Sequence, residues 1–189
     1  MAKKELKDMT LEELWELFPI FLVEPNKEWD ENYREEEKRI KVILSAFDVK
    51  RVSHVGSTAV KGIWAKNIVD ILVEVAPCAE LYPIAEKLAN NGYIIMNVSP
   101  DRISLNRGYT ADGFTDKVYH LHLRHEGDND ELYFRDYLNA HPDVAKEYEK
   151  LKLTLWKRFE HDRDGYTAAK TDFIRAATEQ AKQEFGKRY

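Results

Sequence analysis

The stretch HVGSTAVKGIWAKNIVDIL, residues 54–72, decides the fold of this 189-residue chain. A short β-rich segment at 49–54 leads into this stretch, and Gly56-Ser57-Thr58 forms a turn within it. The apolar, β-branched run at 67–75 that follows predicts a buried strand. A glycine allows a backbone to approach a phosphate closely, and a following serine or threonine can donate its hydroxyl. The same turn also suits an ordinary helix cap, so these residues alone leave two interpretations open.

The predicted strand 67–75 carries a carboxylate where burial is expected. A carboxylate in an apolar strand is costly unless it is paired or binds a cation, so Asp70 needs a partner. Side chains alternate along a strand, which places Asp70 and Glu74 on one face but about 13 Å apart, too far to chelate one ion. Asp70 is therefore either a structural hydrogen-bond acceptor or part of a site.

Two histidines share one face of the predicted strand 117–124. His120 and His122 lie about 6.6 Å apart along the strand, a spacing that can serve one metal ion or one phosphate. The alternative is that each imidazole is a hydrogen-bonded residue of the core.

The rest of the pattern predicts a mixed sheet flanked by helices, an α/β (α+β) fold with a helical C-terminal third. Thr10 and Glu13 form a capping-box pattern at the start of the first helix. We expect strands at 49–54, 67–75, 93–98, 102–106 and 117–124, and helices at 11–18, 28–47, 79–90, 132–140 and from 144 and 166 onward. The Gly/Asp/Thr-rich segment 108–116 predicts a loop.

Composition narrows the class of protein. The net charge of -5, with 43% hydrophobic and 33% charged residues, indicates a globular chain and argues against a dedicated nucleic-acid binder. Cys78 is the only cysteine, so no intramolecular disulfide can form. The charged start 1–5 is unlike a secretory signal, and no apolar run approaches the roughly 20 residues of a membrane span. We expect a cytoplasmic protein without a membrane partner.

The order of the motifs carries a family resemblance. A Gly-Ser turn followed about a dozen residues later by an aspartate on an apolar strand resembles the nucleotidyltransferase superfamily. Within it, the chain resembles the GrpB family through 54–72, Tyr119-His120-Leu121-His122, the FRDYLNAHP helix at 134–142 and a tail containing Tyr166, Lys170, Phe173 and Ile174. The resemblance covers about residues 19–178. It implies one nucleotidyltransferase-like domain over 1–189, with 1–18 as an N-terminal extension and 131–189 as the helical part.

The resemblance also implies a site for a nucleotide or related phosphate compound. Asp70, helped by His120 or His122, would bind a divalent metal, magnesium or manganese, and these three are the candidate catalytic residues. The candidate phosphate- and nucleotide-binding residues are Gly56, Ser57, Lys66, Arg135, Tyr166 and Lys170. If Asp70 serves the metal alone, Asp70→Asn should leave the metal-free protein at least as stable as the wild type.

Three residues depart from the pattern. Leu72 stands where a catalytic nucleotidyltransferase has its second carboxylate, a departure that the family shares, and Lys61 and Asn67 replace prolines usual in the family. Leu72 argues against two-metal nucleotidyl transfer. The alternatives are a catalytically inert nucleotide-binding or regulatory module, and an interaction domain that uses its helical tail. The sequence identifies neither nucleotide, acceptor nor oligomeric state.

Overall fold

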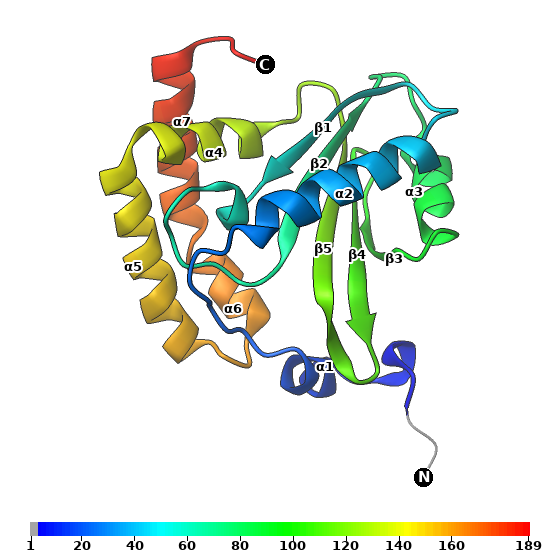
Figure 1. Cartoon of the computed structure of the whole chain (residues 1–189), viewed down its shortest axis with the longest axis horizontal. Helices are drawn as coiled ribbons and strands as arrows, with labels where there is room; N and C mark the ends of the chain where they lie inside the picture. Colours follow the sequence, from blue (N-terminus) through cyan, green and yellow to red (C-terminus); the bar gives the residue numbers. More distant parts are fainter. Residues whose placement is uncertain (1–3) are drawn as a thin grey trace.

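A five-stranded mixed sheet with helices on both faces forms the centre of the chain (Figure 1). The computed structural model describes residues 4–189. The strands, in the spatial order β1-β2-β5-β4-β3, are β1 (Val49–Val55), β2 (Val69–Val75), β3 (Ile94–Val98), β4 (Arg102–Thr110) and β5 (Gly113–His125). Strands β2 and β5 run parallel, whereas the other neighbouring pairs are antiparallel. The predicted mixed sheet and α+β class are confirmed.

The helices precede, interrupt and follow the sheet. They are α1 (Leu11–Leu17), α2 (Glu28–Ile43), α3 (Leu81–Ala89), α4 (Asp130–Ala140), α5 (Pro142–Arg158), α6 (Arg163–Ala168) and α7 (Thr171–Phe185), with short 3-10 turns η1 (Leu6–Asp8) and η2 (Ser57–Ala59). The predicted capping box is present, because the Thr10 and Glu13 side chains each accept the other's backbone N–H. The part of the predicted extension that covers residues 1–3 lies outside the described residues.

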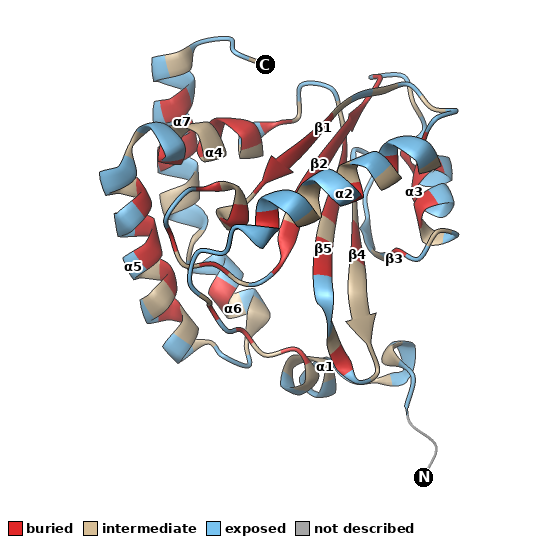
Figure 2. Ribbon diagram, in the orientation of Figure 1, coloured by how far each residue is buried: buried red, intermediate tan, exposed pale blue. Residues whose placement is uncertain are grey.

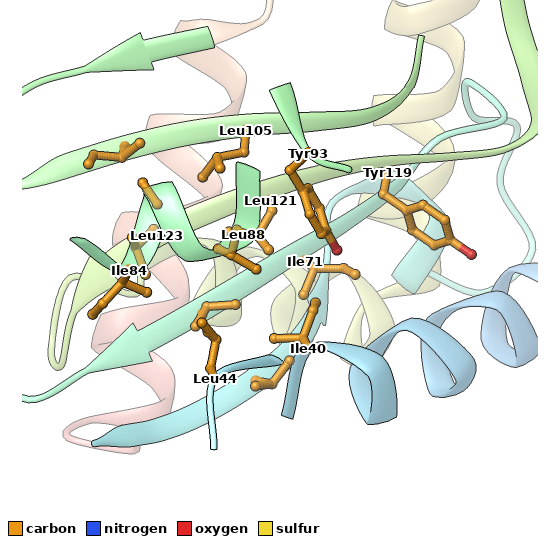
Figure 3. Packing of buried hydrophobic residues seen from close by; sticks show 14 of the residues in the cluster. Ile40, Leu44, Ile71, Ile84, Leu88, Tyr93, Leu105, Tyr119, Leu121 and Leu123 are labelled. Carbon is orange, nitrogen blue, oxygen red and sulfur yellow. The ribbon is translucent and has the colours of Figure 1, made fainter. Parts of the chain in front are cut away.

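One face of the sheet forms the main core against α2 and α3 (Figure 3). Alternate residues of the central strands, such as Ile71, Leu105 and Leu121, are fully buried there. Ile40 of α2 and Leu88 of α3 pack against them. This apolar layer holds β2 and β5 side by side, and it leaves their opposite face free for polar residues.

The opposite face meets the C-terminal helices, whose inward sides are buried (Figure 2). Leu72 is fully buried here against Val55 and Leu132. Glu74, on the same face, is also fully buried and accepts hydrogen bonds from the Arg51 guanidinium and from Asn129. Glu74 therefore has a structural role of its own, and it does not share a site with Asp70.

The predicted loop at 108–116 is wrong. Strand β4 continues to Thr110 and β5 already begins at Gly113, so the two strands form one long hairpin. The pairing shifts between Arg107 and Tyr109, where Gly108 adopts a φ of +92° and lies so close to the Lys117 carbonyl that a Cβ would be 2.4 Å from its oxygen. The glycine therefore marks a β-bulge within a strand, which composition alone does not distinguish from a loop.

No helix within the described range 4–189 combines the length and the apolar character needed to cross a membrane.

Truncating the central strand should test the core. We expect Leu121→Ala to lower the free energy of unfolding by about 3 kcal/mol, because a fully buried leucine on a central strand leaves a cavity. Val42→Ala, at a side chain that is 75% exposed, is the control and should change it by less than about 0.5 kcal/mol. Equal effects in urea unfolding would contradict this packing.

Candidate functional site

Asp70 lies directly against the Gly56-Ser57 turn. Val55, the last residue of β1, pairs with Asp70 of β2, so the turn that follows β1 meets the carboxylate. Gly56 has a φ of +70°, and a Cβ at this position would lie 2.4 Å from Asp70 Oδ2. The conformation and the close approach both require glycine.

The two strand histidines contact the same carboxylate oxygen. Asp70 pairs with His120 across the parallel β2–β5 ladder. Asp70 Oδ1 lies 3.4 Å from His120 Nδ1 and 3.5 Å from His122 Nε2. Burial alone would raise the pKa of Asp70, but the two imidazoles outweigh it and hold that pKa well below its usual range. The carboxylate therefore stays ionised in a largely enclosed position.

A hydrogen-bond chain fixes His120 from its other side. Arg163 Nη2 donates to the Tyr109 hydroxyl at 2.7 Å, and that hydroxyl lies 2.7 Å from His120 Nε2. Since Tyr109 accepts from Arg163, its own hydrogen is directed to Nε2, which leaves the Nδ1 hydrogen for Asp70. Burial lowers the pKa of His120 to about 4, with partial opposition from Asp70, so the ring is uncharged at neutral pH.

Two lysines face one aromatic ring beside Asp70. The ammonium nitrogens of Lys66 and Lys170 lie 5.9 Å and 4.1 Å from the centroid of the Tyr166 ring. Throughout residues 4–189, neither lysine forms an ion pair with a carboxylate. Burial, reinforced by Arg163 and Lys170, lowers the pKa of Lys66 to about 7. Burial also lowers the pKa of Lys170 to about 8, although Asp70 opposes the change.

A third lysine completes the floor of the site. Lys152 of α5 is 1% exposed, and its ammonium donates to the Trp64 carbonyl. Burial, together with the charge of Lys170, lowers the pKa of Lys152 to about 7. The Tyr166 hydroxyl is also buried, and in the described part of the chain it has no hydrogen-bond partner. A polar group of this kind calls for a partner from outside the fold.

These side chains line one cavity of about 390 Å³ between the sheet and the C-terminal helices. Its wall includes the predicted residues Gly56, Ser57, Asp70, His122, Lys66, Tyr166 and Lys170. His120 adjoins the cavity through Asp70. The sequence thus predicted residues that the structure brings together, while their roles stay predictions.

Arg135 lies elsewhere. Its guanidinium binds the His54 carbonyl at 2.9 Å, the Tyr189 hydroxyl at 3.0 Å and Asp136 at 2.7 Å. These contacts use each of its nitrogens and tie α4 to β1, so Arg135 does not reach the cavity wall. We therefore assign it a structural position in place of the predicted phosphate contact.

Sequence reasoning missed Tyr109, Lys152 and Arg163. Tyr109 fell in the segment predicted as a loop, and Lys152 lies on a helix whose other charged residues are largely solvated. Arg163 gave a usable signal, because it precedes Tyr166 by three residues, a spacing that places both side chains on one side of α6.

The predicted metal ligands do not form a ready metal centre. Within the described residues, no three His, Cys, Asp or Glu side chains are grouped so that they could hold a metal ion. His120 already uses both ring nitrogens, toward Asp70 and Tyr109. Asp70 is the one carboxylate beside the two imidazoles, whereas magnesium prefers several oxygen ligands. The three residues therefore do not fit a magnesium or manganese ion held by protein ligands alone.

The sheet, its helices and the Gly-Ser turn beside a strand aspartate define a nucleotidyltransferase-like fold. The structure of Cid1 with the UTP analog UMPNPP matches with a TM-score of 0.52 and 9% identity, over 84% of this chain and 50% of that chain. The GLD-2/RNP-8 complex matches with a TM-score of 0.52 and 13% identity, over 80% and 60%. At these identities the similarity shows the fold alone.

Within that class, the chain belongs to the GrpB family, described as GrpB protein, which matches residues 19–180. The crystal structure of the conserved protein GrpB from Enterococcus faecalis is 28% identical, with a TM-score of 0.75 over 87% of this chain and 99% of that chain. The predicted family and fold are confirmed.

Relatives known from sequence differ in length. The glutamate-rich protein GrpB of Alkalihalophilus pseudofirmus is 35% identical over 164 residues, 82% of this chain and 91% of the relative. YqkA of Bacillus subtilis is 32% identical over 161 residues, which are 84% of this chain but 46% of YqkA. A dephospho-CoA kinase of Mycolicibacterium paratuberculosis is 31% identical over 188 residues, 86% of this chain and 46% of the kinase. The chain thus spans about half the length of two of these relatives.

The contacts of Asp70 reverse the stability effect expected from the sequence. Because both histidines favour the ionised carboxylate, we expect Asp70→Asn to lower the free energy of unfolding by about 2 kcal/mol at pH 7. Its depressed pKa makes this contribution present at neutral pH, and it is lost only as the pH falls below the ordinary range of a carboxyl. The control Asp101→Asn, at an exposed turn position, should be neutral within about 0.5 kcal/mol. An Asp70→Asn protein that unfolds like the wild type would show that the histidine contacts do not stabilise the fold.

Proposed function

We propose that the cavity binds a nucleotide or a related phosphate compound. The observation that carries the proposal is the pair Lys66 and Lys170, two half-buried ammonium groups that share the Tyr166 ring and, among residues 4–189, form no ion pair with a carboxylate. Two half-buried ammonium groups whose charge Asp70 compensates only in part destabilise a fold. A site that retains them is suited to an anion that arrives from solution.

The geometry around the lysines suits phosphate groups. The Gly56-Ser57 turn offers backbone N–H groups and a hydroxyl at one wall, and Lys66 and Lys170 supply charge at the other. Together these groups meet the oxygens of a phosphate chain from several directions.

The Asp70 carboxylate would repel a bare phosphate. A cation or a proton must therefore lie between the carboxylate and the phosphate. Magnesium is usually held by one or two carboxylates together with substrate phosphates. We therefore propose that a divalent metal, magnesium or manganese, enters with the ligand and takes Asp70 as a single protein ligand. The partner that we propose is therefore a small phosphate ligand. We also propose that the protein acts in the cytoplasm.

Nucleotidyl transfer is the second candidate function, and the placement of Asp70 against Gly56-Ser57 favours it. Two-metal transfer needs a second carboxylate. Position 72 holds a leucine that is fully buried under Val55 and Leu132, so β2 supplies no second acid. The other carboxylates of the cavity wall, Asp130 and Glu131, come from α4 and face Lys182 and Arg124. The arrangement thus favours binding over transfer. Release of labelled pyrophosphate from a nucleoside triphosphate, lost in Asp70→Asn, would support transfer.

Thermal unfolding of the purified chain with a panel of phosphate compounds is the test. The panel contains ATP, GTP, UTP, CTP, dephospho-CoA and tripolyphosphate, each with and without magnesium or manganese. The coenzyme A precursor is included because a dephospho-CoA kinase is among the relatives. A ligand at 100 times its Kd should stabilise the fold by about 2.7 kcal/mol. No stabilisation by any member of the panel would overturn the proposed function.

Replacing Lys66 should change the stability of the ligand-free protein and its ligand affinity in opposite directions. We expect Lys66→Met to raise the free energy of unfolding of the ligand-free protein by about 1 kcal/mol, because it removes an enclosed charge. The same change should weaken ligand binding at least tenfold in calorimetric titration. Lys150→Met, on an exposed position of α5, removes the same charge and should do neither. A Lys66→Met protein that binds the ligand like the wild type would contradict the site.

The two lysines also fix the sign of the pH dependence. The pKa values of Lys66 and Lys170, about 7 and 8, lie below those of an unfolded chain. The ligand-free wild type should therefore gain stability relative to Lys66→Met as the pH rises from 7 to 9. Ligand affinity should fall over the same range, because binding needs the charged ammonium groups. Parallel unfolding and titration series at pH 7, 8 and 9 measure both, and an affinity that rises with pH is the contrary result.

A further inference from the structure

A second cavity adjoins the lysine site on the side of the β4–β5 hairpin. It has a volume of about 280 Å³ and lies between the segment after α1 and the start of β5. In Figure 1, α1 lies beside the tip of this hairpin. Its wall includes Phe18, Phe21, Lys66, Asn67, Phe114 and Arg163. The cavity thus combines aromatic rings with a cationic edge.

Lys66 and Ile68 line both cavities. Lys66 is also the cation that faces the proposed phosphate position. Along β5, Val118 lines the aromatic cavity, and His120, two residues on, contacts Asp70 on the same face of the strand. That spacing corresponds to about 6.6 Å. One ligand of moderate length can therefore occupy both cavities, with Lys66 between its two ends.

The aromatic wall is held in place before any ligand arrives. The Phe114 ring packs at 4.9 Å from Phe18 and 6.3 Å from Phe21, measured between centroids. Tyr109 supports Phe18 and Phe114 from behind, at 4.7 Å and 5.0 Å. Phe21 remains 39% exposed at the rim. A planar ring that enters this cavity meets rigid aromatic surfaces, which favours stacking.

The β-bulge at Gly108 positions this wall. Gly108 approaches the Lys117 carbonyl and the Thr115 side chain so closely that no Cβ fits. The shifted register turns residues 114–116 toward the segment after α1. Bulges often redirect side chains next to binding sites. This explains why the hairpin departs from regular pairing at this point.

Polar atoms at the edge of the cavity suit a heterocycle with hydrogen-bonding edges. Asn67 Oδ1 accepts from the Trp29 indole at 2.8 Å, while its amide nitrogen donates to no group in the described part of the chain. Asp116 supplies an exposed carboxylate on the opposite wall. A donor and an acceptor thus face the same space, as ring nitrogens and amino groups require.

We propose that this aromatic cavity is the subsite for the purine or pyrimidine ring of the same ligand whose phosphates lie beside Lys66 and Lys170. The inference rests on the proposed function and assigns it a substrate class, a nucleoside phosphate in place of a simple phosphate. Phe114, Phe21 and Phe18 stack on or enclose the ring, and Asn67 and Asp116 meet its edge.

A comparison of ATP with tripolyphosphate measures how much the base contributes to the binding affinity. In isothermal titration with magnesium present, the wild type should bind ATP about tenfold or more tightly than tripolyphosphate, the contribution of one stacked base. Phe21→Ala, at the exposed rim, and Phe114→Ala should each remove most of this difference and leave tripolyphosphate binding unchanged. The Lys66→Met protein should lose affinity for both compounds. The affinities of GTP, UTP and CTP then show which base the subsite prefers.

The outcomes separate the two proposals. If the wild type binds ATP and tripolyphosphate equally, or if the phenylalanine variants weaken both compounds equally, the ring subsite is wrong while the phosphate site stands. If neither ATP nor tripolyphosphate binds, the ring subsite is wrong; if no compound of the phosphate panel binds, the proposed function fails as well. Phe21→Ala keeps the test valid if Phe114→Ala does not fold, because Phe21 contributes little to the core.

Discussion

The contact between the Asp70 carboxylate and its three neighbours sets the geometry of the whole cleft. Gly56 lies next to Asp70 Oδ2, and His120 and His122 contact Asp70 Oδ1. This arrangement needs β1, β2 and β5 adjacent and in fixed register, which the apolar layer under α2 and α3 provides. It also needs glycine at position 56. The carboxylate can stay ionised in this position because the two imidazoles compensate for its loss of water.

The cations in the cleft are the feature on which the proposed binding function rests. Lys66 and Lys170 are half-buried and pair with no carboxylate in the part of the chain that the structure describes, and the Lys152 ammonium donates to a backbone carbonyl. Such groups destabilise the empty protein, and a phosphate ligand would reverse that cost. Glu74, equally buried, has fixed partners and no exposure to the cavity. The contrast separates a charge with fixed structural partners from the charges to which we assign a ligand.

The sequence was sufficient for what depends on local pattern and alternation. An apolar strand with one aspartate, two histidines two residues apart and a Gly-Ser turn predicted the side chains that meet around Asp70. Position in space was harder to predict where a contact joins distant segments. Arg135 matched its motif but binds the His54 carbonyl and Tyr189. Tyr109 lay in a segment whose glycines indicated a loop, because a β-bulge and a loop share the same composition. Lys152 became part of the cleft only through the packing of α5.

The pKa of Lys66 is the quantity on which the account depends most directly. It can be measured by following the Nζ resonance of isotopically labelled lysine through a pH titration, with Lys66→Met identifying the signal. We expect the Lys66 titration to have its midpoint near pH 7 in the ligand-free protein and above pH 9 when ATP and magnesium are bound. A midpoint near the ordinary lysine value of about 10.4 without ligand would contradict it, because Lys66 would then be neither enclosed nor held for an anion.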